Sequence, residues 1–103
     1  MIPLIQQHCD DLARLCQQYR VKRLEVFGSA VEERRFDNER SDLDFLVEFL
    51  PLQPGEHADA YFGLLEALEH LFGRGVDLVM TQAIKNPYFL EKINQARVSL
   101  YAA

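Results

Sequence analysis

The chain has 103 residues, of which 49% are hydrophobic and 26% charged, and its formal net charge is −5. This length and composition are typical of a single small globular domain over residues 1–103. The acidic balance argues against direct binding to a nucleic-acid backbone, but it allows a nucleotide whose phosphates arrive with a divalent metal. No stretch approaches the roughly 20 apolar residues of a membrane span, and no basic-then-apolar leader is visible. We therefore expect a cytoplasmic protein without membrane contact.

The predicted elements alternate between helices and strands. Apolar residues at helical spacing predict helices over 4–20 and 54–72, a short helix is expected over 29–34, and Asn86-Pro87 starts a helix that runs to about residue 97. Short β-prone segments predict strands over 24–27, 42–50 and 76–80, followed by an extended tail at 98–101. This order predicts an α+β fold (an α/β layer) with a small mixed three-stranded sheet and helices on one face.

Alternation along the strand at 42–50 separates an apolar face from a carboxylate face. The face that must lie against the helices holds Leu43, Phe45, Val47 and Phe49. Asp42 and Asp44 share the other face, which we expect to be largely uncovered, and they lie about 6.6 Å apart along the strand. Ionised carboxylates so close together repel unless a cation or a proton lies between them, and Mg²⁺ prefers oxygen ligands of this kind.

A third carboxylate is expected beside this pair. Asp77 points away from its apolar neighbours in the strand at 76–80, so three carboxylates would converge if the two strands are adjacent. Three carboxylates can hold two metals about 3.5–4 Å apart for in-line nucleotidyl transfer. Gly28-Ser29, at the end of the strand at 24–27, would let backbone N–H groups and a hydroxyl approach phosphate oxygens. Each piece alone is commonly a turn or a solvated surface group, whereas their order along the chain is much more specific.

The segments VFGS, SDLDFLVEF and VDLV resemble the minimal nucleotidyltransferases of the DNA polymerase β-like superfamily. More closely, they resemble the MntA-type antitoxins encoded beside HEPN-domain toxins. The resemblance implies a protein adenylyltransferase that uses two Mg²⁺ ions and adds AMP from ATP to a tyrosine of a HEPN RNase toxin, which silences the toxin. It implies that Gly28 and Ser29 hold phosphates. Asp42 and Asp44 would ligate both metals, and Asp77 would complete the metal nearer the acceptor and help to deprotonate its hydroxyl.

The loop after Gly-Ser departs from the family pattern. Twelve residues separate Ser29 from Asp42, two more than usual, and the small arginine-containing run is replaced by AVEERR. Arginine is thereby shifted to Arg34, Arg35 and Arg40, which we expect to meet the triphosphate or the transition-state charge; a solvated charged loop is the alternative. The altered loop also favours a rival hypothesis, in which a catalytically weak or inactive module neutralises its partner by binding.

The length of the chain disfavours two other kinds of nucleotidyl transfer. Transfer to a small molecule usually needs an added substrate domain, and a polymerase needs a grip on its template, for which 103 residues leave no room. The closing helix and the last extended segment suit a homodimer and a hetero-oligomer with a toxin equally well. Tyr88, Phe89 and Tyr101 favour core packing, with a partner surface as the alternative.

Two further pairs of residues carry simple expectations. Glu25 and Glu48 should face solvent from their strands. Cys9 and Cys16 lie seven residues apart in one predicted helix, or about 10.5 Å along its axis. A disulfide needs Cα atoms within about 7 Å, so we expect both thiols to be reduced.

Overall fold

Four strands form one mixed sheet in the computed structural model, which describes residues 2–32 and 42–103. The strand order is β3-β2-β1-β4. β1 (Val21–Phe27) is antiparallel to both β2 (Leu43–Phe49) and β4 (Arg97–Ala102). β2 runs parallel to β3 (Val76–Met80). The mixed α+β architecture is confirmed, but the predicted count of three strands is wrong.

The additional strand is β4, which the sequence predicted as an extended tail. β4 pairs with the edge of β1 that β2 leaves free. Without it, that edge would present a row of unpaired N–H and C=O groups. Val98, Leu100 and Tyr101 of β4 are partly buried against the main core, so apolar burial and backbone pairing both favour the strand.

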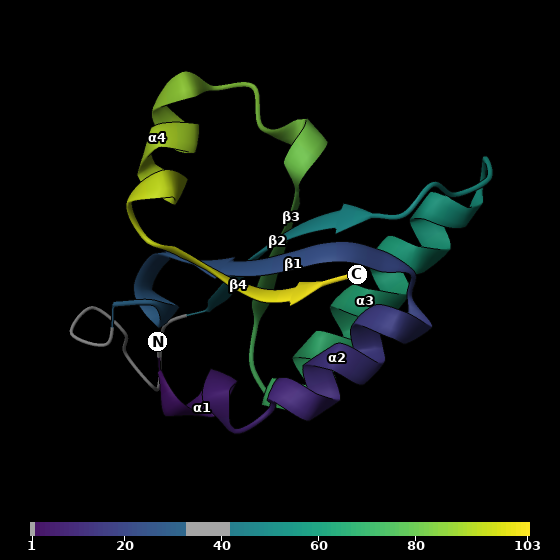
Figure 1. Ribbon diagram of the computed structural model, residues 1–103, viewed down its shortest axis with the longest axis horizontal. Coiled ribbons are helices and arrows are strands. Elements are labelled where there is room, and N and C mark those ends of the chain that lie inside the picture. Colours follow the sequence, from purple (N-terminus) through teal and green to yellow (C-terminus); the bar gives the residue numbers. More distant parts are fainter. Residues whose placement is uncertain (1, 33–41) are drawn as a thin grey trace.

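The helices lie on both faces of the sheet (Figure 1). α2 (Cys9–Gln18) and α3 (Glu56–Phe72) cover one face, whereas α4 (Pro87–Gln95) lies over the opposite face. The single helix predicted over 4–20 is divided into α1 (Pro3–Gln6) and α2. Two carboxylates, Asp10 and Asp11, occupy the first turn of α2, where the helix dipole favours negative charge.

The main core lies between the sheet and α2 and α3. Leu43, Phe45 and Val47 of β2 are fully buried in it, as the alternation of this strand predicts. The ring of Phe45 stacks on that of Phe72 from the end of α3, with 5.9 Å between their centroids. Burying side chains of this size contributes about 1.5–3 kcal/mol each, so this face supplies most of the hydrophobic stabilisation.

A second, smaller cluster covers part of the opposite face, so the expectation of helices on one face only is wrong. Phe27, Leu46 and Ile93 are buried there, with Val79 and Ile84 packed against them. Leu46 lies on the carboxylate face of β2, and its register partner on β3 is Val79. These apolar side chains would be exposed without a cover, and Ile93 of α4 provides one.

Glu25 is buried rather than solvent-facing. Its exposed fraction is 8%, and both of its carboxylate oxygens accept hydrogen bonds of 2.7 Å from Nε and Nη2 of Arg97. The strand missed by the sequence prediction brings this arginine into place, because Arg97 begins β4 beside β1. A bidentate guanidinium–carboxylate pair offsets the cost of removing the charges from water.

Both cysteines are free, as expected: Cys9 is exposed and Cys16 is buried. Burial raises the pKa of the Cys16 thiol to about 12, which keeps it protonated and unreactive. No helix in the described part of the chain has the length and apolar character needed to cross a membrane.

Candidate active site

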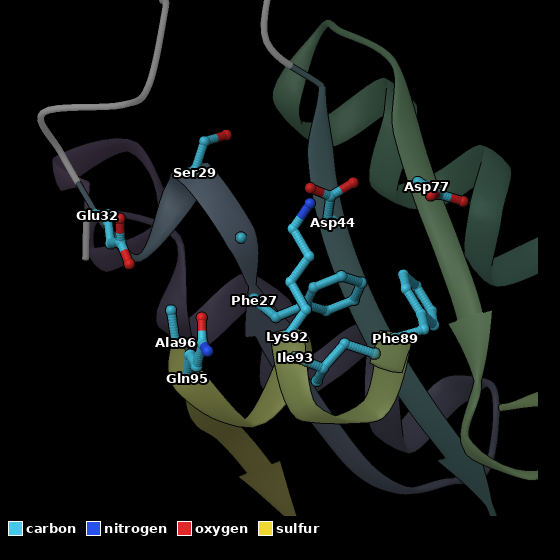
Figure 2. Close-up of a pocket in the computed structure, with 11 residues that line it drawn as sticks. Phe27, Ser29, Glu32, Asp44, Asp77, Phe89, Lys92, Ile93, Gln95 and Ala96 are labelled. Atoms are coloured by element: carbon cyan, nitrogen blue, oxygen red, sulfur yellow. The ribbon is translucent and has the colours of Figure 1, made fainter. Parts of the chain in front are cut away.

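Two carboxylates face each other across the parallel pair of strands. Asp44 of β2 and Asp77 of β3 are register partners, and adjacent strands are separated by about 4.8 Å. Asp44 is half-buried, whereas Asp77 is exposed. Figure 2 shows the two side chains on neighbouring strands at the edge of one pocket. The strand adjacency on which the predicted carboxylate cluster depends is therefore present.

The pKa of Asp44 reports the concentration of negative charge at this point. Burial, followed by the negative charges of Asp77 and Asp42, raises the pKa of Asp44 to about 6. Each of these influences disfavours the ionised carboxylate. A cation placed among the carboxylates would reverse the effect, so the site has the electrostatics of a cation-binding position.

Asp42 does not line the pocket, in contrast to the other two carboxylates. It is exposed, and its side chain lies close to Gly75, where an added Cβ would lie only 2.5 Å from Asp42 Oδ1. Among residues 2–32 and 42–103, no three acidic, histidine or cysteine side chains are close enough to form a ready metal cluster. The donor chemistry nevertheless suits Mg²⁺, because Asp42, Asp44 and Asp77 all offer carboxylate oxygens, and no histidine or cysteine lies among the described residues that line the pocket.

Gly28 brings the first strand into contact with Asp44. Its φ is +74°, and a Cβ at this position would lie 2.8 Å from Asp44 Oδ2. Both the left-handed backbone and the close approach therefore require glycine. The Gly28 N–H donates a 3.3 Å hydrogen bond to the Ala96 carbonyl. Ser29 follows in the short 3₁₀ helix η1 (Gly28–Ala30), which stands where a longer helix was predicted.

The pocket has a volume of about 290 Å³ and is built from four parts of the chain. Its lining residues are Phe27, Gly28, Ser29, Glu32, Asp44, Asp77, Phe89, Lys92, Ile93, Gln95 and Ala96. One end is apolar, where the rings of Phe27 and Phe89 meet edge to face at 6.3 Å between centroids. The other end holds the carboxylates and Ser29. A pocket of this size encloses part of a nucleotide and leaves the rest open to solvent or to a partner.

The structure brings together four of the predicted site residues, Gly28, Ser29, Asp44 and Asp77. Asp42 lies close enough for its charge to act on Asp44 but does not line the pocket. Arg34, Arg35 and Arg40 lie outside the described residues.

Sequence reasoning missed the wall contributed by α4. Phe89, Lys92, Ile93 and Ala96 line the pocket at positions i, i+3, i+4 and i+7 of this segment. That spacing, together with the uncovered Leu46, is the signal that would have indicated it. Tyr88, for which core packing was favoured, is 81% exposed, and Tyr101 is half-buried against the main core.

The chain matches proteins of known family over nearly its whole length. The model of the nucleotidyltransferase domain family matches residues 10–100. Two proteins of Methanocaldococcus jannaschii named as candidate protein adenylyltransferases, MJ0128 and MJ1379, are 41% identical over 83 residues and 36% identical over 81 residues. Each of these alignments covers 79% of this chain and 78% of the relative. A solved structure described as a candidate minimal nucleotidyltransferase has a TM-score of 0.70 and 30% identity, covering 91% of this chain and 90% of the other.

Two toxin–antitoxin structures share the fold at lower identity. A complex solved with AMP-PNP has a TM-score of 0.67 at 18% identity and covers 92% of this chain and 73% of the other. A complex of a tri-AMPylated HEPN toxin with an MNT antitoxin from Shewanella oneidensis has a TM-score of 0.64 at 16% identity, with coverages of 96% and 73%. The family match spans every element that builds the pocket, and the chain therefore belongs to the nucleotidyltransferase domain family and is a nucleotidyltransferase.

Proposed function

We propose that this protein transfers AMP from ATP to a tyrosine of a HEPN-type RNase toxin and thereby acts as its antitoxin. The observation that carries the proposal is the register pair Asp44–Asp77 beside Gly28-Ser29 in one pocket. Support for a protein acceptor comes from the relatives named as candidate protein adenylyltransferases. Support for the kind of partner comes from the shared fold with an antitoxin bound to a tri-AMPylated HEPN toxin.

Each residue of the site has a role in this proposal. Ser29 donates its hydroxyl hydrogen to a phosphate oxygen, and the absence of a side chain at Gly28 lets the phosphate chain approach the backbone. Asp77 is exposed on the edge strand, where the tyrosine hydroxyl of a bulky acceptor can reach it and give up its proton. The tyrosine oxygen then bonds to the α-phosphorus as the bond from that phosphorus to the pyrophosphate oxygen breaks.

Asp42, Asp44 and Asp77 are the residues that would hold Mg²⁺, proposed as two ions. When bound, the metal would stabilise charge that develops on the phosphate oxygens. Asp44 is half-buried at the centre of the three, so its carboxylate gains most from a nearby cation. We place Arg34, Arg35 and Arg40 in the same nucleotide site on the grounds of sequence alone.

The alternative is a module that neutralises the toxin by contact and transfers nothing. The position of Asp42 close to Gly75 favours it, because a preformed three-carboxylate cluster is not seen among the described residues. The two candidates differ in one observable, which is a covalent change in the mass of the partner.

Intact-mass spectrometry of the protein co-purified with its HEPN partner, before and after incubation with ATP and Mg²⁺, tests the proposal. We expect the partner to gain one or more AMP units. Asp44→Asn and Asp77→Asn should each lower the rate by about 100-fold or more, and peptide mapping should place the AMP on tyrosine. Glu48→Gln is the matched control, since Glu48 lies on the same face of β2 but does not line the pocket. A stable complex whose masses do not change would replace the proposal with the contact-only alternative.

A further inference from the structure

One face of α4 forms a wall of the nucleotide pocket. The helix begins at Asn86, whose side-chain oxygen accepts a 2.9 Å hydrogen bond from the Tyr88 N–H. It is fixed to the sheet by Ile93, which is 2% exposed and packs with Leu46 and Phe27. Lys92 precedes this anchor and also lines the pocket. The backbone of Lys92 is therefore held in place next to a buried residue, while its long side chain is exposed.

The side chain of Lys92 extends along the pocket with its ammonium group directed toward the end where Asp44 lies (Figure 2). The remaining ionisable residues in the described lining are acids: Glu32, Asp44 and Asp77. Lys92 makes no ion pair with any residue that the structure describes. The described charges that raise the pKa of Asp44 are those of Asp77 and Asp42, and no described ion pair joins Lys92 to these carboxylates.

We propose that Lys92 binds the phosphate chain of the nucleotide, from the side of the pocket opposite Ser29. A phosphate chain supplies anionic oxygens that no described residue offers this ammonium group as an ion-pair partner, and charge-assisted hydrogen bonds of this kind are short and strong. Ser29 on η1 and Lys92 on α4 would then hold the chain from two walls. Lys92 is a binding residue in this assignment, separate from the carboxylates that act at the transferred phosphorus.

This inference rests on the proposed nucleotide transfer, but a binding measurement tests it without any transfer. Isothermal titration of the full chain with α,β-methylene-ATP and Mg²⁺ gives the affinity for the phosphate chain, and adenosine gives the affinity for the remainder of the ligand. Lys92→Met removes the charge and keeps most of the side-chain length, whereas Lys92→Arg keeps the charge. Lys85→Met is the matched control, because Lys85 is an exposed lysine shortly before α4 that does not line the pocket.

We expect Lys92→Met to weaken binding of α,β-methylene-ATP by about 10- to 100-fold, the loss typical of a hydrogen bond to a charged group. Binding of adenosine should change less than twofold. Lys92→Arg should retain most of the affinity, and Lys85→Met should behave as the wild type. Because Lys92 is exposed, all variants should unfold at the wild-type temperature.

Two results would overturn the assignment: unchanged binding of the triphosphate analogue by Lys92→Met, or an equal loss for the analogue and for adenosine. Either would leave the proposed function standing if the wild type still modifies its partner. Conversely, a wild type that binds the analogue but modifies nothing would sink the proposed function and still permit the test of Lys92. A wild type that binds no nucleotide would contradict both the proposed function and the role assigned to Lys92.

Discussion

The two faces of the sheet are built from the same strands and differ in almost every physical respect. Alternate residues of β2 place Phe45 into a dry core under α2 and α3 and place Asp44 into a pocket under α4. Burial of Phe45 stabilises the folded state, whereas desolvation and like-charge repulsion at the ionised Asp44 destabilise it. The face covered by α2 and α3 thus supplies the stability with which the pocket face tolerates clustered carboxylates.

This contrast explains how so small a chain can maintain a group of clustered carboxylates. A free energy of unfolding of a few kcal/mol leaves little margin for repulsive charges. The apolar cluster of Phe27, Leu46 and Ile93 lies next to the carboxylates on the same face and limits the unfavourable region to the ends of β2 and β3. Glu25 is an instructive exception, because it lies on the pocket face and yet its role is structural.

The largest effect is expected on the face covered by α2 and α3. Phe45→Ala removes a fully buried ring that stacks on Phe72 and should lower the free energy of unfolding by about 3–5 kcal/mol. Chemical denaturation followed by circular dichroism measures the change. A loss below about 1 kcal/mol would mean that this face does not supply most of the stability of the fold.

The buried pair of Glu25 and Arg97 should also contribute to stability. Arg97→Met leaves the buried Glu25 carboxylate without its bidentate partner and should lower the free energy of unfolding by about 2–3 kcal/mol. The same denaturation measurement applies. The double variant Glu25→Gln with Arg97→Met should recover part of the loss, because it no longer buries an unpaired charge. No recovery would indicate that packing of the arginine stem, rather than charge, stabilises this position.

Removing the charge of Asp44 should stabilise the protein, in contrast to the two substitutions above. The pKa of Asp44 is about 6 in the folded protein against an ordinary value of 3.8, so the folded chain binds more protons between these values. Stability from this group is therefore greatest below about pH 4, falls as the pH rises to about 6 and is constant above that. Asp44→Asn should raise the free energy of unfolding by about 1–2 kcal/mol at pH 7.5, a figure reduced for solvent screening, with little effect at pH 4.

Thermal unfolding in EDTA at the two pH values tests this prediction. Adding Mg²⁺ should raise the melting temperature of the wild type and have little effect on Asp44→Asn. Equal stability of the two proteins at pH 7.5 would show that the carboxylates do not strain the folded state.

The smallest effect concerns the two thiols. Cys9 is exposed and Cys16 is buried with a pKa raised to about 12, so a thiol reagent such as iodoacetamide should label one cysteine in the native protein and both in denaturant. Mass spectrometry counts the labels. Alkylation of Cys9 should leave stability almost unchanged, whereas native labelling of Cys16 would show that the core beneath the sheet opens readily.

The parts of this molecule that depend on local spacing could be predicted from the sequence. Two-residue alternation placed Phe45 and Asp44 on opposite faces, and Asn86-Pro87 indicated the start of α4. The approach of Asp77 to Asp44 was predicted on the condition that the two strands are neighbours, and their pairing meets that condition; the register itself could not be predicted.

The rest depends on contacts between distant segments. The spacing of α4 and the exposed position expected for Leu46 indicate that a cover is needed, but that Ile93 provides this cover is decided by packing across the sheet. The pairing of Glu25 with Arg97 joins residues 72 positions apart and requires β4, whose short sequence carries only a weak strand signal. Lys92 could be recognised as a pocket residue only after α4 had been placed.

The hydrogen bond between Gly28 and Ala96 has a consequence for the order in which the molecule assembles. β1 lies between β2 and β4, both of which follow it in the chain, and the pocket combines residues that range from Phe27 at the end of β1 to Ala96 after α4. Pairings of such long range incur their loop-closure entropy before contacts compensate for it, and they form slowly. A pocket lined by these residues therefore forms only after β1, β2, β3 and α4 have come together.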